Sequence, residues 1–302
     1  MSFNLITILG PTATGKTKLA AQLANKFNGE IISADSRQVY VGMDIGTGKD
    51  LSDYCINGKL IPYHLIDIIS PKEEFNLFLF KKYFNQAFAE IRNNNKLPFL
   101  AGGTGLYLSS ILQNYNLKES MNDSSRINEL NLKEIDELKK ILIELNPKLH
   151  NTTDLLDKER IIKAILVSNA SDAIEAVEIS SLNIGIMPER SEIKKRITER
   201  LKIRLQHGMI EEVERLIKEG VTFEKLSFFG LEYKFIGLYL KGKLNYNDMY
   251  QKLNTAIHQF AKRQATWFRK MEREGVKINW MDSPDYDKAC KLITEVTQKI
   301  PK

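Results

Sequence analysis

One glycine motif near the N-terminus limits the possible folds of this chain more than any other feature. Residues 10–17 (GPTATGKT) match the pattern GxxxxGK[ST] at every fixed position. A β-rich apolar run over residues 4–9 precedes the motif, and a pattern with apolar residues on one helical face follows from about Gly15. The agreement of strand, spacing and helix favours a phosphate-binding loop over a coincidental glycine-rich turn.

The motif also predicts which groups hold the phosphates. In such a loop the glycines permit a tight turn, backbone N–H groups point inward, and the helix N-terminus adds partial positive charge. Lys16 supplies a point charge to a phosphate, and the Thr17 hydroxyl ligates Mg²⁺. The residues expected to bind a di- or triphosphate are Gly10, Thr12, Thr14, Gly15, Lys16 and Thr17. From this motif alone, a kinase of nucleotides or small metabolites is the first interpretation.

Further β-rich runs alternate with helical patterns in the first third of the chain. These runs cover residues 30–33, 63–68 and 97–101, and a long amphipathic helix is predicted over 76–95. The alternation predicts an α/β fold, namely a P-loop NTPase-like parallel sheet flanked by helices, with ligands at the carboxyl ends of the strands. After a strand at 182–187, the remaining predictions are helices over 189–207, 209–218, 230–241, 246–274 and 285–299 and a strand over 277–280.

The middle of the chain differs in composition from both ends. Residues 114–181 are mostly polar, with helical patterns over 132–145 and 158–168 and a loop-like segment over 119–126. A length of 302 residues would suffice for two equal domains. The motifs instead predict one P-loop core from residues 1–113 and 182–302, interrupted by a helical insert over 114–181.

Composition excludes several classes of protein. Hydrophobic residues make up 43% of the chain, which is enough for a buried core. Two cysteines without a CxxC pair exclude a disulfide scaffold and a zinc ribbon. No apolar run has the length of a signal peptide or a membrane span, so we expect a cytoplasmic protein, with a monomer as the default. The net charge of +6 permits a nucleic-acid partner without requiring one.

Two more predicted strands end in residues suited to chemistry. Asp35 directly follows the second strand, in DSRQVY. Because parallel strands end in one crevice, this carboxylate faces the phosphate loop and could hold a Mg²⁺-bound water or accept a proton. A simple Asx turn is the alternative. The strand at 97–101 leads into GGTGLY, whose glycines allow close backbone approach and whose Thr104 adds a hydroxyl, although a plain glycine turn also explains it.

These three strand ends together resemble those of the tRNA dimethylallyltransferase (tRNA isopentenyltransferase) family. The matching segments are GPTATGKT, DSRQVY followed by MDIGT, and GGTGLY, in that order and at those intervals. His64 in YHLID and the helix AKRQATW at residues 261–267 resemble two more family motifs. The resemblance implies transfer of a dimethylallyl group from dimethylallyl diphosphate to the N6 amine of the adenosine 3′ to the anticodon in tRNA. It also implies Mg²⁺ as cofactor.

The resemblance further implies roles for individual residues. Asp35 would hydrogen-bond the N6 amine and act as general base, and Thr104 would contact the diphosphate near the reacting centre. Lys16 would hold the diphosphate, and Arg263 would meet the diphosphate or the tRNA backbone. The substrate side of the crevice is expected to involve Ser36, Gln38, Tyr40, Lys49, Gly103, Arg160 and Gln264. The helical insert and the basic C-terminal helices would grip the anticodon stem-loop.

A few positions depart from the family pattern. Phe229 stands where the family usually has an arginine, Ile257 and His258 replace Thr-Arg, and Gly48 replaces a commoner alanine. Because the changes at Phe229 and His258 remove cations from the substrate side, we expect the departures to affect activity and tRNA preference more than diphosphate binding.

A basic run within the predicted helix 189–207 has two interpretations. Its members are Lys194, Lys195, Arg196, Arg200, Lys202 and Arg204. Such a run is usually a solvated helix face, whereas the resemblance favours contact with tRNA phosphates for part of it.

Three other functions stay open from the sequence: prenylation of free adenine nucleotides, a P-loop kinase, and a non-catalytic RNA-binding protein.

Overall fold

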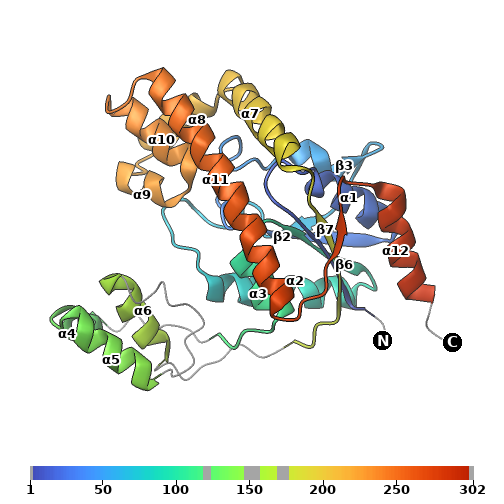
Figure 1. The fold of residues 1–302 in the computed structure, drawn as a ribbon, viewed down its shortest axis with the longest axis horizontal. Helices are drawn as coiled ribbons and strands as arrows, with labels where there is room; N and C mark the ends of the chain where they lie inside the picture. The colour runs from blue at the N-terminus through green and yellow to red at the C-terminus, as the bar shows by residue number, and fades with distance from the viewer. Residues whose placement is uncertain (1–2, 118–123, 146–156, 169–176, 299–302) are drawn as a thin grey trace. The chain divides into compact units, whose positions relative to one another are not determined.

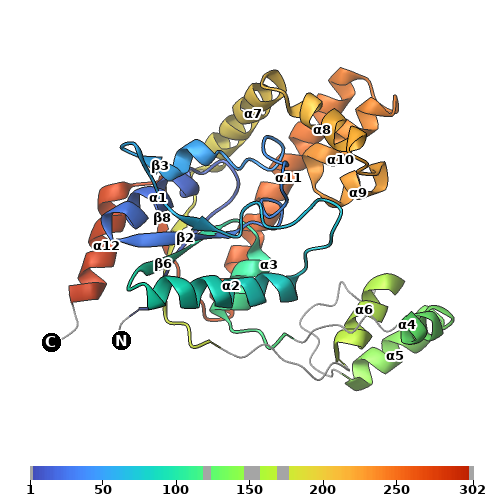
Figure 2. The same cartoon turned by 180° about the vertical axis from the view of Figure 1, so that it is seen from behind.

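The computed structural model describes residues 3–117, 124–145, 157–168 and 177–298. The chain divides into two compact units. The first consists of Met1–Asn114 and Glu178–Lys302, and the second of Tyr115–Val177. Each unit has a hydrophobic core of its own (Figures 1 and 2).

A six-stranded sheet forms the centre of the first unit. Its strands lie in the order β5-β2-β6-β1-β7-β8, and every neighbouring pair is parallel. Their bounds are Leu5–Leu9 for β1, Gly29–Ala34 for β2, Tyr63–His64 for β5, Leu97–Gly102 for β6, Ser181–Ile186 for β7 and Asn279–Met281 for β8. β1 is buried along its whole length, as expected for a strand covered on both faces. The predicted parallel α/β sheet is therefore confirmed.

Helices cover both faces of this sheet (Figures 1 and 2). α1 (Lys16–Lys26) and α12 (Tyr286–Gln298) share one core cluster with the strands. α2 (Leu77–Asn93) and α3 (Gly105–Leu112) lie on the opposite face. The last third adds α7 (Arg190–Gln206), α8 (Met209–Lys218), α9 (Phe223–Phe228), α10 (Leu231–Leu240) and the long α11 (Tyr246–Arg273). None of the described helices combines the length and the apolar character needed to cross a bilayer.

The third predicted strand is shorter than the sequence pattern suggests. β5 ends at His64, because Leu65 and Asp67 adopt positive φ angles of 64° and 55°, which extended chain does not allow. The imidazole of His64 lies beside the carboxylate of Glu30, with Nε2 2.7 Å from Oε2. The apolar residues after β5 thus belong to a loop that runs beside the segment after β2, where Ile69 forms a parallel bridge with Tyr40.

Several short elements had no counterpart among the predicted ones. Residues 51–60 form a 3₁₀ helix, η1 (Leu51–Tyr54), and a hairpin of β3 (Cys55–Ile56) and β4 (Lys59–Leu60). The hairpin turns on Asn57-Gly58, a pair suited to two consecutive positive φ angles. α9 begins after Thr222, whose hydroxyl accepts a hydrogen bond from the Lys225 N–H at 3.2 Å. Both signals were present in the sequence as local turn and cap chemistry.

The described residues of the second unit form three helices. They are α4 (Ser124–Asn131), α5 (Ile135–Leu145) and α6 (Lys158–Ser168). The helix predicted over 158–168 has these bounds, whereas the predicted loop at 119–126 becomes helical from Ser124. Their apolar faces meet in a core formed by Leu130, Leu138, Leu142, Ile161, Ile162 and Ile165. Spacings of three and four residues within this set are those of amphipathic helices.

In the first unit, the loop after β2 is held by a buried carboxylate. Glu212 of α8 accepts hydrogen bonds from three consecutive backbone N–H groups, those of Asp44, Ile45 and Gly46, at 2.8, 2.8 and 3.0 Å. The hydroxyl of Tyr233 donates a fourth, at 2.7 Å. Glu212 is only 7% exposed. Because buried N–H groups without an acceptor cost free energy, this side chain fixes the conformation of the MDIGT loop.

Replacing Glu212 should destabilise the protein in a graded way. Glu212→Ala removes the acceptor of four donors, and we expect the free energy of unfolding to fall by about 3 kcal/mol or more. Glu212→Gln keeps one acceptor oxygen and should lose less, about 1–2 kcal/mol. Denaturant unfolding measures both against Glu211→Gln, which removes the same charge from an exposed neighbour on α8. Wild-type stability in Glu212→Ala would show that this carboxylate does not hold the loop.

Candidate active site

The phosphate loop connects β1 to α1, as the motif predicts. Ala13 and Gly15 adopt left-handed conformations, with φ angles of 63° and 79°. A Cβ atom at Gly10 would lie 2.5 Å from the carbonyl oxygen of Ile186, so only glycine fits there. The hydroxyl of Thr14 is buried and donates to the Pro11 carbonyl at 3.0 Å. Thr14 therefore shapes the loop from inside.

Lys16 is the first residue of α1 and lies half-buried beside this loop. Its ammonium donates to the Pro11 carbonyl at 3.2 Å. Burial lowers the pKa of Lys16 to about 8; the nearby Arg200 lowers it further, while the carboxylates of Asp35 and Asp50 oppose the shift. An ammonium in such a place carries a charge that an anion would stabilise.

Asp35 and Thr104 connect the ends of two adjacent strands. Asp35 follows β2, and its Oδ1 accepts a hydrogen bond from the Arg37 N–H at 2.9 Å, which is the Asx turn named above as an alternative. Thr104 follows β6, and its Oγ1 accepts from the Ser36 N–H at 3.2 Å. The Thr104 N–H donates to the Ala34 carbonyl at 3.2 Å. Both predicted residues therefore lie at the carboxyl ends of neighbouring strands of the sheet.

Two glutamine side chains form hydrogen bonds with the loops at these strand ends. Gln264 of α11 is 7% exposed; its Oε1 accepts from the Thr12 N–H at 3.0 Å, and its Nε2 donates to the Gly103 carbonyl at 2.8 Å. Gln38 donates through Nε2 to the Gly48 carbonyl at 3.1 Å. Gln264 thus links the phosphate loop to the turn after β6, although it lies more than 250 residues from Thr12 in the sequence.

Lys49 lies inside the loop that Glu212 holds. It is 1% exposed, and its ammonium donates to the Tyr40 carbonyl at 2.7 Å and to Asp44 Oδ1 at 2.8 Å, and also pairs with the carboxylate of Asp67. These three acceptors surround the charge. In this structure Lys49 is a positioning residue for the loop, and direct contact with substrate remains only a sequence-based expectation.

Tyr40 and Phe229 pack together in the core beneath this loop. Their ring centroids are 4.8 Å apart at an interplanar angle of 63°. Phe229 also packs edge-on against Tyr233, with centroids 6.3 Å apart. Both Tyr40 and Phe229 are 1% exposed or less. The position where the resemblance leads one to expect an arginine thus holds a core aromatic residue, which supplies no cation to the substrate.

Two predicted residues, Arg263 and Arg160, take no part in the contacts described above. Arg263 is exposed on α11, with its guanidinium 5.9 Å from the ring centroid of Phe260. Arg160 lies on α6 in the second unit, and its side chain falls outside the described part of the structure. His258, one of the departures, lies with Nε2 3.3 Å from both Thr198 Oγ1 and the Lys194 carbonyl oxygen.

One member of the basic run contacts the phosphate loop, and a second lines the same cavity beside it. Arg200 Nη1 donates to Thr12 Oγ1 at 3.3 Å, and Nη2 lies 2.7 Å from Asp50 Oδ2. Arg204, one helical turn further along α7, lies 3.2 Å from the same Asp50 oxygen. This gives the run a third interpretation, in which part of it belongs to the phosphate site. In the sequence, the four-residue spacing of Arg200 and Arg204 already indicates that both lie on one face of the helix.

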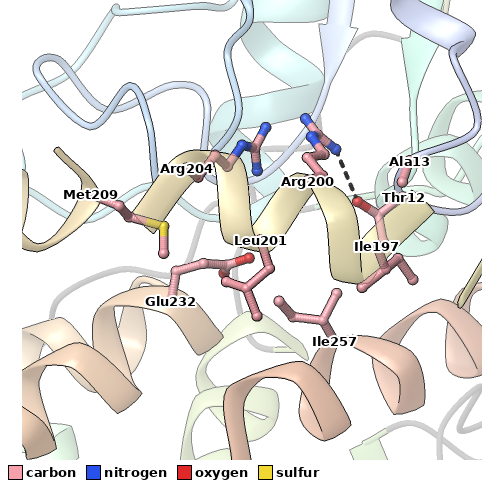
Figure 3. A pocket seen from close by; sticks show the side chains of 9 residues that line it. All are labelled: Thr12, Ala13, Ile197, Arg200, Leu201, Arg204, Met209, Glu232 and Ile257. Atoms are coloured by element: carbon pink, nitrogen blue, oxygen red, sulfur yellow. Dashed lines mark hydrogen bonds between the residues drawn. The ribbon is translucent and has the colours of Figure 1, made fainter. Parts of the chain in front are cut away.

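A small cavity of about 20 Å³ opens beside the phosphate loop (Figure 3). It is lined by Thr12, Ala13, Ile197, Arg200, Leu201, Arg204, Met209, Glu232 and Ile257. Apolar side chains from α7 and α11 form one wall, and the two arginines and Glu232 are its charged groups. Burial raises the pKa of Glu232, against the effect of both arginines. No motif in the sequence pointed to Glu232, because a lone Glu on a helix has no distinctive pattern.

Within the described ranges, no group of three or more His, Cys, Asp or Glu side chains is arranged to hold a metal ion. The side-chain oxygen that the motif assigns to Mg²⁺ is that of Thr17, half-buried in the first turn of α1. A cation at this place would need further oxygens from a bound phosphate group and water.

Known proteins resemble this chain in sequence along most of its length. A family model described as IPP transferase matches residues 38–271, and one described as isopentenyl transferase matches residues 3–57. A tRNA dimethylallyltransferase 1 from Geotalea uraniireducens (strain Rf4) is 52% identical over 285 residues, which cover 93% of this chain and 93% of that protein.

Solved structures agree with the sequence comparison. The full-length tRNA isopentenylpyrophosphate transferase from Bacillus halodurans has a TM-score of 0.70 and 30% identity, covering 98% of this chain and 99% of that one. A eukaryotic dimethylallyltransferase acting on tRNA has a TM-score of 0.79 and 22% identity, covering 99% and 81%, and it shows the fold alone. The resemblance predicted from the strand ends is confirmed, and the chain belongs to the tRNA dimethylallyltransferase (IPP transferase) family.

Proposed function

We propose that this enzyme transfers the dimethylallyl group of dimethylallyl diphosphate to the N6 amine of the adenosine 3′ to the anticodon in tRNA. Membership of the family supports prenyl transfer to tRNA. The observation that carries the proposal is that Lys16, Asp35 and Thr104 follow β1, β2 and β6, which are neighbours in one parallel sheet. An anion-binding loop and a carboxylate therefore face the same crevice.

The reaction needs a neutralised leaving group and an amine that can lose a proton. Lys16, the loop N–H groups and Arg200 stabilise the charge that the diphosphate gains as the allylic C–O bond breaks. The N6 nitrogen forms the new C–N bond, and Asp35 accepts the proton that the amine loses. Thr104 follows β6, which lies between β2 and β1 in the sheet, and its hydroxyl would contact the diphosphate. The products are the N6-prenylated adenosine and diphosphate.

Mg²⁺ enters the proposal as the counter-ion of the diphosphate. Thr17 is the protein group that would hold it, since its hydroxyl lies in the first turn of the helix that follows the loop. Mg²⁺ commonly keeps several waters and takes few protein ligands beside substrate phosphates, so a site without a carboxylate cluster fits it. When bound, the ion neutralises part of the negative charge on the leaving group.

The acceptor is an anticodon loop for a physical reason. An adenine can reach a crevice at the strand ends only if it leaves its stack, and bases in single-stranded loops are the cheapest to extrude. α11 presents Arg263, Arg269 and Arg273 as exposed cations that suit the phosphates of the adjoining stem. We also propose that the enzyme acts as a monomer, because the three strand ends that form the proposed site belong to a single sheet.

Product analysis tests the function directly. The protein is incubated with dimethylallyl diphosphate, Mg²⁺ and either unmodified tRNA or AMP, and prenylated nucleosides are identified by mass spectrometry. We expect the product on tRNA, independent of ATP. Product on AMP alone would favour free-nucleotide prenylation, and a phosphorylated product formed from ATP would favour a kinase.

Two substitutions separate the catalytic role of Asp35 from its turn. Asp35→Asn keeps an oxygen that accepts from the Arg37 N–H, whereas Asp35→Ala loses it. If Asp35 is the general base, both variants should lose roughly 10²-fold or more in transfer rate and keep nearly normal tRNA affinity. Single-turnover assays and tRNA binding measure the two properties. Near-normal turnover in Asp35→Asn would show that Asp35 is not the general base and only stabilises the Asx turn.

The low pKa of Lys16 predicts a pH dependence. With a pKa of about 8, the ammonium loses its proton as the pH rises through 8, so the affinity of the free enzyme for diphosphate should weaken above that pH. Calorimetry with inorganic diphosphate from about pH 6.5 to about pH 9.5 measures this. Lys16→Arg stays charged, so it should lack this weakening, and the ionisation of the ligand is common to both proteins. Parallel curves for the two would exclude titration of Lys16.

A further inference from the structure

The carboxylate of Asp50 holds two arginines at the edge of the phosphate loop. Asp50 Oδ2 lies 2.7 Å from Arg200 Nη2 and 3.2 Å from Arg204 Nη2. The side chain of Asp50 is 47% exposed, whereas those of Arg200 and Arg204 are 31% and 14% exposed. Two cations therefore share one anion, which itself stays open to solvent.

Gly48 makes this arrangement possible. Its φ angle is 69°, and a Cβ atom there would lie 2.0 Å from Arg204 Nη2 and 2.5 Å from Arg200 Nη2. Any side chain at position 48 would have to displace both guanidinium groups. The Gly48 carbonyl is also within 3.5 Å of Arg200 Nη2. The absence of a side chain thus lets the arginines pack directly on the backbone before Asp50.

Arg200 connects this cluster to the anion site. Its other terminal nitrogen donates to Thr12 Oγ1 in the phosphate loop at 3.3 Å, as the dashed line in Figure 3 shows. Arg200 lowers the pKa of Lys16 and Asp50 raises it, so both act electrostatically on the same ammonium. Asp50 therefore cancels part of the positive charge that the loop offers to a phosphate group.

We propose that Asp50 is a built-in counter-anion that competes with diphosphate for Arg200 and Arg204, and thereby sets how tightly the phosphate loop retains its diphosphate product. This rests on the proposed function, in which the loop binds diphosphate. Oxygens of the entering diphosphate replace Asp50 at Arg200, whose contact with Thr12 already places the guanidinium beside the loop. When diphosphate leaves, the carboxylate returns to the arginines. Asp50 is a positioning residue, because it acts through Arg200 and Arg204.

Two variants should change diphosphate affinity in opposite directions. Asp50→Asn keeps an oxygen that accepts from the arginines but removes the competing charge, and asparagine tolerates the positive φ of 26° at this position. We expect its Kd for inorganic diphosphate with Mg²⁺ to fall about three- to tenfold, and the inhibition constant of diphosphate in the transfer reaction to fall equally. Gly48→Ala displaces both guanidiniums and should raise that Kd. Isothermal calorimetry and product inhibition measure these changes.

Two more variants make the outcome decisive. Glu192→Gln removes the same charge from an ion pair with Arg196 on α7 (N to O 2.7 Å) and should leave diphosphate affinity at the wild-type value. If Asp50→Asn binds diphosphate as tightly as the wild type or more weakly, the counter-anion proposal is wrong. A purely structural role of Asp50 predicts weaker diphosphate binding in both Asp50→Asn and Gly48→Ala. Lys16→Ala tests the proposed function separately. If it binds diphosphate like the wild type, the loop is not the diphosphate site, whatever Asp50→Asn shows.

Discussion

The parallel register of β2, β6 and β1 is the constraint on which the site depends. Leu9 of β1 and Ala34 of β2 both lie opposite Gly102 of β6, so the three strands end in one row. A Cβ atom at Gly102 would lie 2.3 Å from the Ala34 carbonyl oxygen, which shows how closely the strand ends meet. The next residues along each strand therefore start the phosphate loop, the Asp35 turn and the Thr104 turn side by side.

Helices from the last third of the chain hold these three loops in place. Gln264 of α11 joins the phosphate loop to the turn after β6, and Glu212 of α8 binds three N–H groups of the loop after β2. Arg200 of α7 links that same loop to the phosphate loop. Loops rich in glycine have little structure of their own, so their conformation is fixed by polar side chains from distant helices.

Charge is balanced closely around the proposed diphosphate position. Lys16, Arg200 and Arg204 contribute cations, and Asp35 and Asp50 contribute anions that act against them. An anion site must bind its substrate and also release its product, and a carboxylate within reach of the arginines serves the second need. The aromatic packing of Phe229 on Tyr40 fits this picture, because cations enter the site from α7 and not from the segment before α10.

Local patterns were enough to predict the sheet, the phosphate loop and most of the helices. The motif at 10–17 and the strand ends at Asp35 and Thr104 depend on short-range turn chemistry, so their places could be predicted from the sequence. Patterns failed where a local rule was overridden, as at β5, where Leu65 and Asp67 leave the extended conformation despite apolar neighbours. Local patterns also could not predict the role of residues such as Glu212, whose burial depends on contacts with a loop far away in the sequence.

The sequence by itself determined the family, the class of fold and the residues at three strand ends, because these follow from short motifs and from periodicity. Only the tertiary structure decided which side chains surround those ends. It turned Lys49 and Tyr40 inward, left Arg263 exposed on α11, and brought Arg200, Arg204 and Asp50 together beside Thr12. The physical reason is that such contacts join residues more than 100 positions apart, and only the packing of helices against the sheet sets their distances.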